Sequence, residues 1–473
     1  MIDAPAGTGK TYTESILCAR LRSMSKLVLC VASTGIAGLQ LPGGWTAHSM
    51  FKLPLEEKNV SGAMCNISAE SQRAEVLRKC DLIVWDEIPM SHRFSVEALN
   101  LTLQDLMGND NIMGGKTVLL SGDLRQIGPV VKHGGPAETI DASLISSPLW
   151  PHVQRMRLTI SQRTQAHTTT DDGIDAVPLA YIHEVPDSPK DQFFIDNTDS
   201  FEELIDFVYQ DILTADPTDF KARAICLDPH DNNLDFVATA DLNAIDVSGV
   251  PPHALELKLN CMVMITRNLN FKQGLVNGQK AIVRGYSTRI VHVELLDGLS
   301  SLVLIPRIRL NAKVGRNGIA FSRLQLPLRV CYALTINKSQ GQTLSKIGLD
   351  LRSDVFTHGQ LYVALSRAQK RSSIMCLTLP ARLRGSLNRT AFVANITFPA
   401  FVNAATDTIT DSPPLPPQYI DFIGFTHATN DQVPNSDEGQ LQEDDNHDDE
   451  QTMSRHPNQC ADGGWIEAKG LSR

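Results

Sequence analysis

The feature that most constrains this chain is a glycine-rich loop at residues 4–11, Ala-Pro-Ala-Gly-Thr-Gly-Lys-Thr. Loops of this pattern join a buried strand to a helix, and their backbone N–H groups and the helix N-terminus bind phosphate. The pattern opens with Ala4 where glycine is usual, whereas the core Gly-Thr-Gly-Lys-Thr is intact. The hydroxyl of Thr11 is predicted to bind Mg²⁺. The residues predicted to hold nucleotide phosphates are Gly7, Thr8, Gly9 and Lys10.

An acidic pair, Asp86-Glu87, follows the apolar run 82–85. At the end of a buried strand, Asp86 is predicted to bind Mg²⁺ directly or through water, and Glu87 to polarise the attacking water. A chance glycine-rich turn and a structural Asp-Glu pair are the alternatives. Because both motifs occur in one chain, the combination favours a nucleoside triphosphatase that uses ATP and Mg²⁺.

Only residues 1–3 precede the phosphate loop. Such a loop normally leaves the C-terminal end of a buried central strand. We therefore expect this first strand to be lacking, or nearly so. The expectation that follows is an N-terminally truncated chain, either because the gene starts upstream or because the chain is a relic.

The alternation of apolar runs with helical patterns predicts an α/β fold with parallel sheets. The runs at 26–32, 82–85 and 117–120 are apolar throughout, as strands buried on both faces are. Short β-rich runs with Gly and Asn turns predict a small β-barrel within the second domain. The predicted domains are a first domain at 1–165, a connecting segment at 166–200, a second domain at 201–254 and 326–403, the β-barrel insert at 255–325 and a tail at 404–473.

The net charge of −10 is a property of the tail. Residues 411–473 contain 13 Asp or Glu against 3 Lys or Arg, so the rest of the chain is neutral. This Pro-rich and acidic composition predicts disorder, with a partner-binding or DNA-mimicking role as the alternative. The 9 cysteines are scattered, which favours reduced thiols in a nucleus, cytosol or organelle matrix. We see no secretory signal and no apolar stretch that would span a membrane.

Three further side chains are candidates for the triphosphatase site. Gln126 follows the third apolar run and can sense the γ-phosphate or water, since its amide both donates and accepts. Arg367, in Ala-Leu-Ser-Arg, and Arg163 are candidates to neutralise charge that develops on the phosphoryl group. Each arginine taken alone is equally compatible with a surface salt bridge.

Two longer stretches of the sequence resemble motifs of a known protein family. Residues 332–343 resemble motif V of superfamily-one DNA helicases, and residues 362–367 resemble motif VI. Residues 32–37 and 42–51 are similar to motifs Ia and Ib of one branch, the petite-integration-frequency (PIF-one) helicases, including those of Helitron transposons. The resemblance covers roughly residues 3–400.

The resemblance implies an ATP-dependent 5′-to-3′ DNA helicase or translocase that acts on single-stranded and on duplex or fork DNA. It implies two RecA-like P-loop domains with an SH3-like insert, and it adds Gln340 and Gly341 to the ATP site. Hydroxyl groups, backbone amides and lysine suit phosphates, while His48 and Phe51 would stack on bases or belong to the core. The segments that match the DNA-contacting motifs contain Thr34, Gly35, His48, Phe51, Thr335, Lys338 and Ser339.

Two other functions compete with an active helicase: a degenerate, non-catalytic DNA-binding remnant, and a non-unwinding P-loop ATPase. Motifs V and VI disfavour the second. Pro89 stands where the family usually has Ser, and Ala368-Gln369 stand where Val-Thr is commoner. The expected roles are genome maintenance (repair, recombination, telomeres) or Helitron transposition. The expected location is the nucleus, with the mitochondrion as the alternative; the sequence does not indicate an oligomeric state.

Overall fold

The computed structural model divides the chain into two compact units, Met1–Asp407 with Trp465–Arg473, and Thr408–Gly464. The second unit lies outside the described residues. No helix in the described part of the chain is both long and apolar enough to cross a membrane. The residues that the structure describes are 1–54, 60–131, 134–160, 196–211, 223–227, 250–252, 254–287, 289–296, 301–314, 319–379, 383–384, 390–391, 396–406, 466–469 and 471–472.

The first domain is built on a parallel sheet with the strand order β3-β2-β4-β5-β1-β6. Its strands are β1 (Ile2–Asp3), β2 (Val28–Ala32), β3 (Trp45–Thr46), β4 (Leu82–Asp86), β5 (Thr117–Gly122) and β6 (Met156–Arg157). Its helices are α1 (Lys10–Ser23), α2 (Gly35–Gln40), α3 (Ala47–Phe51), α4 (Gln72–Lys79), α5 (Arg93–Met107) and α6 (Pro136–Ala142). The three predicted apolar runs therefore form the strands β2, β4 and β5.

The first strand is nearly, but not wholly, lacking. β1 is only two residues long, yet Ile2 pairs with Ser121 of β5 and with Met156 of β6. The backbone N–H of Ala4 continues this pairing by donating to the carbonyl of Gly122 over 2.9 Å. Because neighbours on both sides supply hydrogen bonds, two residues suffice to place the start of the phosphate loop inside the sheet.

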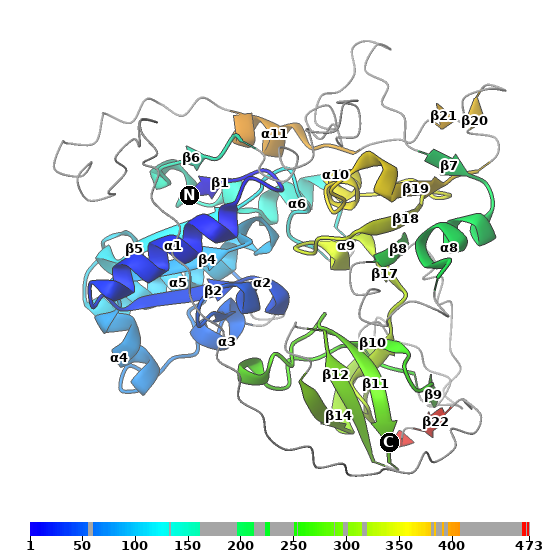
Figure 1. The fold of residues 1–473 in the computed structure, drawn as a ribbon. Helices are drawn as coiled ribbons and strands as arrows, with labels where there is room; N and C mark the ends of the chain where they lie inside the picture. Colours follow the sequence, from blue (N-terminus) through cyan, green and yellow to red (C-terminus); the bar gives the residue numbers. More distant parts are fainter. Residues whose placement is uncertain are drawn as a thin grey trace, which may run out of the picture. The chain divides into compact units, whose positions relative to one another are not determined.

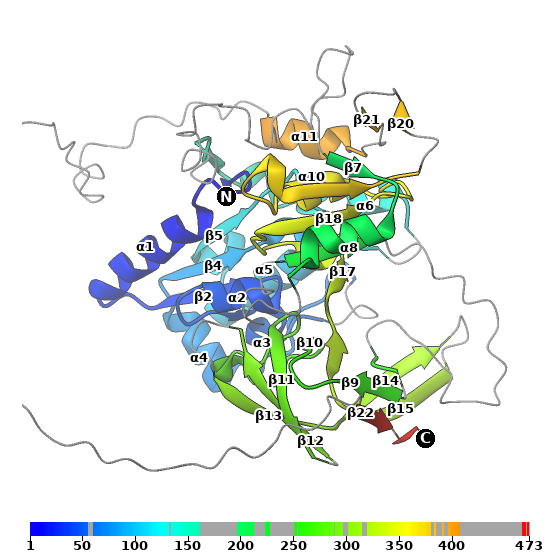
Figure 2. The same ribbon diagram turned by 45° about the vertical axis from the view of Figure 1, so that its right-hand side comes forward.

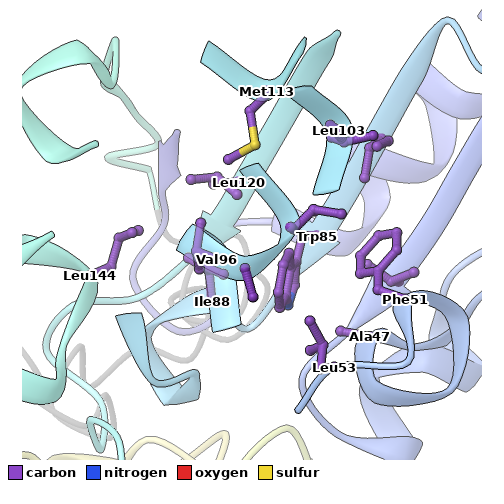
Figure 3. Packing of buried hydrophobic residues seen from close by; sticks show 14 of the residues in the cluster. Ala47, Phe51, Leu53, Trp85, Ile88, Val96, Leu103, Met113, Leu120 and Leu144 are labelled. Atoms are coloured by element: carbon purple, nitrogen blue, oxygen red, sulfur yellow. The ribbon is translucent and has the colours of Figure 1, made fainter. Parts of the chain in front are cut away.

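Helices cover both faces of this sheet, α1 one face and α5 the other (Figures 1 and 2). Successive side chains of β2 point to opposite faces of the sheet. Cys30 packs with Cys18 of α1, whereas Val31 belongs to the core that includes Leu99 of α5. Figure 3 shows the larger core around Trp85, whose ring lies 5.5 Å from that of Phe51. Strands buried on both faces explain why the runs are apolar without alternation.

The second domain holds another parallel sheet, with the strand order β17-β8-β18-β19-β7. Helix α8 (Phe201–Tyr209), at the start of the predicted second domain, packs on this sheet. Its strands are β7 (Asp196–Thr198), β8 (Arg223–Leu227), β17 (Ala333–Thr335), β18 (Lys346–Asp350) and β19 (Ile374–Leu377). Its helices are α8 (Phe201–Tyr209), α9 (Ile336–Ser339) and α10 (Gln360–Leu365). Helix α11 (Pro399–Thr406) instead packs on the first domain, because Phe401 and Ala405 belong to the core around Trp85.

Antiparallel strands occupy the segment expected to form the insert, and their order in one sheet is β13-β12-β11-β10-β16. β16 corrects the predicted boundary at residue 325, because it pairs antiparallel with β10 instead of joining the second domain. A hairpin of β14 and β15 follows β13 along the chain. The strands are β9 (Ala254–Leu257), β10 (Met262–Ile265), β11 (Lys280–Tyr286), β12 (Ile290–Leu295), β13 (Leu302–Pro306), β14 (Ile308–Val314), β15 (Ile319–Gln325) and β16 (Leu328–Val330).

The predicted tail is shorter than expected at both of its ends. Helix α11 runs across the expected boundary at residue 404 and ends at Thr406. Near the C-terminus, β22 (Ile466–Lys469) pairs with β9, and β23 (Leu471–Ser472) pairs with β15. These two segments are therefore part of the first unit and not of a disordered tail. The acidic run before them lies outside the described residues.

Candidate nucleotide and nucleic-acid site

The phosphate loop has the backbone conformation that its glycines permit. Gly7 and Gly9 have φ of 85° and 84°, in the left-handed region that glycine adopts without a steric penalty. Thr8 closes the turn, because its hydroxyl donates to the carbonyl of Pro5 over 2.8 Å. Helix α1 then begins at Lys10 without a side-chain cap, so its first N–H groups are free to bind an anion.

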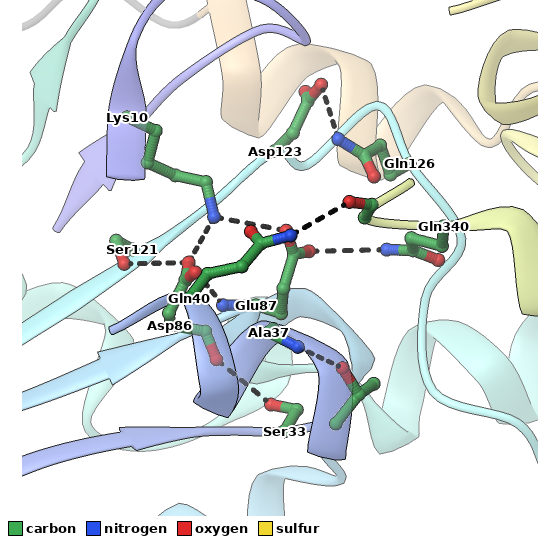
Figure 4. A network of polar contacts seen from close by, with 12 residues as sticks. Lys10, Ser33, Ala37, Gln40, Asp86, Glu87, Ser121, Asp123, Gln126 and Gln340 are labelled. Atoms are coloured by element: carbon green, nitrogen blue, oxygen red, sulfur yellow. Dashed lines mark hydrogen bonds and ion pairs between the residues drawn. The ribbon is translucent and has the colours of Figure 1, made fainter. Parts of the chain in front are cut away.

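Lys10 lies against the acidic pair at the end of β4 (Figure 4). Its ammonium group forms an ion pair with Asp86 and lies 3.1 Å from Oε1 of Glu87. Asp86 also accepts from the hydroxyl of Ser121 (3.1 Å) and from the backbone N–H of Glu87 (2.7 Å). Burial by itself lowers the pKa of Lys10, but the two carboxylates outweigh burial and hold the pKa above its ordinary value.

Glu87 has a strained backbone, with φ 53° and ψ 39°. A non-glycine residue in this region costs about 1–3 kcal/mol, and such residues cluster at functional sites. The conformation lets Oε2 of Glu87 accept from the amide of Gln340, in the second domain, over 3.3 Å. Gln340, which the resemblance assigns to the ATP site, therefore lies beside the acidic pair.

Two buried glutamines each leave an acceptor unused. Gln126 donates through its amide to Asp123 (3.1 Å), as Gln340 does to Glu87. Within the described residues the Oε1 atoms of Gln126 and Gln340 have no hydrogen-bond partner. Buried acceptors of this kind are costly unless something donates to them. A water molecule or a nucleotide hydroxyl fits that need, which is consistent with the predicted roles of both residues.

Glu14 is a site residue that the sequence interpretation missed. It lies one turn after Lys10 on the same face of α1, is fully buried, and has no hydrogen-bond partner for either carboxylate oxygen among the described residues. Burial, followed by the nearby negative charge of Asp86, raises the pKa of Glu14 to about 8. The i, i+4 spacing from Lys10 was the available signal.

A buried polar network joins the phosphate loop to α10 of the second domain. Asp123, which is fully buried, binds Arg125 (2.6 Å) and accepts from the hydroxyl of Tyr362 (2.8 Å). The same hydroxyl oxygen accepts from the backbone N–H of Ala6 over 3.2 Å. Arg125 continues the network to Asp3 of β1 (3.0 Å). Sequence reasoning identified neither side chain, because the contact between Tyr362 and Asp123 joins residues that are distant along the chain.

The structure describes only one of the two candidate arginines, Arg367. Arg367 is buried, and its guanidinium donates to the carbonyls of Val363 (3.0 Å) and Gln342 (3.2 Å) and to the hydroxyl of Ser366 (2.8 Å). These bonds anchor Arg367 within the second domain. Arg163 lies outside the described residues, so its role stays a prediction.

Several residues of the DNA-contacting motifs remain candidates. His48 and Lys338 are exposed, and Thr335 is half-buried. Thr34 caps α2 by accepting from the backbone N–H of Ala37 over 3.3 Å. Gly35 is buried, and a Cβ atom there would lie 2.9 Å from Val276, so the position needs glycine for packing.

Two of the predicted DNA contacts need correction. Phe51 has no exposed surface and belongs to the core beside Trp85, so it cannot stack on a base (Figure 3). Ser339 is also fully buried, and its hydroxyl donates to the carbonyl of Ile336 over 2.7 Å. In both cases the motif contains a residue that supports the fold beneath a candidate surface.

The residues present fit Mg²⁺ of the kind that accompanies a nucleotide. Such an ion is usually held by one or two protein oxygens, with phosphates and water completing its shell. Thr11 on α1 offers a hydroxyl and Asp86 a carboxylate. No group of three or more His, Cys, Asp or Glu side chains suited to a metal occurs in the described residues.

Fold and site together define a class: proteins with a P-loop phosphate site and two parallel-sheet domains. Residues 1–178 match the family model "PIF1-like helicase", and residues 242–286 match "DNA helicase Pif1, 2B domain". These two matches confirm the resemblance to PIF1-like helicases.

Relatives in other organisms are similar over most of this chain. The human ATP-dependent DNA helicase PIF1 is 26% identical over 401 residues, which cover 79% of this chain and 57% of the human protein. The zebrafish (Danio rerio) protein of the same name is 27% identical, over 80% of this chain and 58% of its own length. The chain thus spans a little under three fifths of these relatives.

Solved structures support the fold. The crystal structure of Pif1 helicase from Bacteroides in complex with ADP-AlF3 and single-stranded DNA has a TM-score of 0.51 at 23% identity. The match covers 79% of this chain and 87% of that one. A likeness at this identity confirms the α/β architecture with parallel sheets.

Proposed function

We propose that this chain is an ATP-dependent DNA helicase or translocase that couples ATP hydrolysis to movement on single-stranded DNA. The observation that carries the proposal is the contact of Lys10, Asp86, Glu87 and Gln340, which joins the phosphate loop, the acidic pair and the second domain. The family-model matches and the names of the relatives support the same activity. The proposed substrates are ATP, single-stranded DNA and duplex or fork DNA.

The proposed chemistry assigns one task to each side chain. Lys10 moves from the carboxylates to the β- and γ-phosphates when nucleotide enters, because phosphates carry more charge than the acidic pair that holds it now. Glu87 then orients and polarises the attacking water, and the free oxygens of Gln126 and Gln340 accept from it. Mg²⁺, when bound by Thr11 and Asp86 with the phosphates, neutralises charge on the phosphoryl oxygens. Arg367 and Arg163 are proposed to contact the γ-phosphate and neutralise the charge that develops on it.

For DNA, we propose contacts from Thr34, Gly35, His48, Thr335 and Lys338. The exposed Lys338 lies near Arg329, and two cations at one place attract a phosphate backbone.

Further proposals are a 5′-to-3′ direction and a role in repair, recombination, telomere maintenance or Helitron transposition. Nuclear location, with the mitochondrion as alternative, and partner binding by the acidic segment at 411–473 are proposals as well.

The test is ATP hydrolysis by the full chain with and without single-stranded DNA. We expect DNA to raise turnover strongly, and we expect Lys10→Ala and Glu87→Gln each to reduce it by about 10²-fold or more. Matched controls are Lys26→Ala and Glu75→Gln, because both residues lie on the surface in ion pairs with Asp81 and Lys79.

The outcomes separate the competing functions. Turnover that ignores DNA would contradict the helicase proposal and favour a non-unwinding ATPase. DNA binding without any turnover, in a folded chain, would identify a degenerate remnant. DNA-stimulated turnover without strand separation on a forked duplex would restrict the activity to translocation.

A further inference from the structure

Two buried thiols face each other between α1 and the sheet of the first domain. Cys18 lies on the inner face of α1 and Cys30 in β2, and their sulfur atoms are 3.4 Å apart. Both residues are almost completely buried, at 0% and 1% exposure. The sulfurs are therefore in direct contact across the helix–sheet interface, in a position where an apolar pair would pack as well.

A cation lies next to this pair. The guanidinium of Arg22 approaches Sγ of Cys30 to 3.5 Å and donates to the carbonyl of Val28 over 3.1 Å, which fixes its position. Cationic neighbours stabilise thiolates and make them reactive. The hydrogen bond from Cys30, with a smaller contribution from Arg22, lowers the pKa of Cys18 to about 7.

We propose that Cys18 and Cys30 are an oxidation site that forms a reversible disulfide when the folded protein meets a small two-electron oxidant such as hydrogen peroxide. The Cys18 thiolate attacks one peroxide oxygen, which gives a sulfenic acid and releases hydroxide. The Cys30 thiol then attacks that sulfur, the S–O bond breaks, and water leaves. Two thiols and one peroxide thus yield one disulfide and two waters.

The geometry needs little adjustment for this bond. The sulfurs must approach from 3.4 Å to about 2.05 Å, which side-chain rotation and a small shift of α1 can supply. The bond would connect α1 to β2 about two helical turns beyond Lys10. The inference does not depend on the proposed helicase activity, because it concerns thiol chemistry within the first domain.

The experiment treats the reduced full chain with hydrogen peroxide under native conditions and maps disulfides by non-reducing peptide mass spectrometry. We expect one peptide pair joined through Cys18 and Cys30, with the loss of two hydrogen atoms, that dithiothreitol separates again. Cys18→Ser and Cys30→Ser must each abolish it. Cys80→Ser is the matched control, because the Cys80 thiol is buried too but donates to the carbonyl of Leu77 (3.1 Å).

Three outcomes would overturn the proposal. The first is oxidation of Cys18 to sulfinic acid without any link to Cys30. The second is a link that forms only after denaturant is added, since the folded state would then keep the thiols inert. The third is a native link between other cysteines that persists in Cys18→Ser. Circular dichroism of the serine variants identifies loss of fold, and the peptide map of the unsubstituted chain decides the question if a variant fails to fold.

Discussion

At the scale of single residues, the buried carboxylate of Glu14 has the most unusual environment. Its neighbours Asp86 and Glu87 carry the same charge, and Lys10 is already paired with both. Most buried carboxylates have hydrogen-bond donors, whereas this one has none among the described residues. Ionised Glu14 therefore opposes folding in the absence of nucleotide and cation.

The first prediction follows from the sign of this effect. The folded-state pKa of Glu14 is raised from 4.5 to about 8, so its stabilising contribution is present below pH 4.5 and is lost as the pH rises toward 8. Because a glutamine side chain does not ionise, Glu14→Gln removes this loss of stability with rising pH. The variant should therefore become progressively more stable than the unsubstituted chain between about pH 5 and about pH 8, in urea unfolding without nucleotide.

The control for this experiment is Glu75→Gln, since Glu75 is fully exposed and its pKa is lowered by Lys79. Its stability relative to the unsubstituted chain should not rise over the same range. A Glu14→Gln variant that gains nothing between these pH values would mean that Glu14 has a partner in solution.

At the scale of elements, the start of α10 depends on one glycine. Gly359 has φ 74°, and a Cβ atom there would lie 2.5 Å from the carbonyl oxygen of Arg125. The helix can thus approach the turn at residues 123–126 only because this position has no side chain. Nearby, the buried ring of His358 lies 3.1 Å from the carbonyl of Leu124 and accepts from the N–H of Phe398 over 2.9 Å.

The second prediction concerns this close approach. Gly359→Ala should destabilise the fold through backbone strain and also through a steric contact, because α10 must move away from Arg125. The contact should add about 1–3 kcal/mol to the loss from strain. Gly108→Ala is the comparison: Gly108 has φ 63° at the end of α5 but open space around it. Chemical denaturation of both variants measures the difference. Equal losses would show that the steric contact is relieved without cost.

At the scale of the whole first unit, Tyr362 connects parts of the chain that are far apart in sequence. Its hydroxyl group contacts the phosphate loop at Ala6 and the turn at Asp123, while its helix belongs to the second domain. A hydrogen bond to a buried carboxylate contributes about 1.5–3 kcal/mol. Loss of this bond should therefore affect how α10 responds to nucleotide at the phosphate loop.

The third prediction is that Tyr362→Phe lowers DNA-stimulated ATP turnover by about tenfold or more while ADP affinity changes little. The ring keeps its packing, and only the link between Ala6 and Asp123 is removed. Tyr209→Phe serves as the control, because that hydroxyl donates to the carbonyl of Tyr332 over 2.6 Å, away from the site. Steady-state kinetics with a titration of a fluorescent ADP analogue measures both quantities. Loss of ADP affinity with unchanged maximal turnover would contradict a coupling role.

The sequence by itself determined those features that depend on neighbouring residues. The glycines of the phosphate loop, the acidic pair at the end of β4 and the apolar strands β2, β4 and β5 are local patterns, and each of them has the predicted structure. The family resemblance was recognised from strings of the same kind.

Tertiary structure alone decided the rest. A two-residue β1 is a strand only because β5 and β6 flank it, and β16 joins the insert because β10 offers it an edge. Phe51 and Ser339 are buried by packing that no local pattern shows. The contacts of Glu87 with Gln340 and of Asp123 with Tyr362 join residues more than two hundred positions apart. Such pairings depend on the geometry of the whole fold, because hydrogen bonding and burial act between neighbours in space and not in sequence.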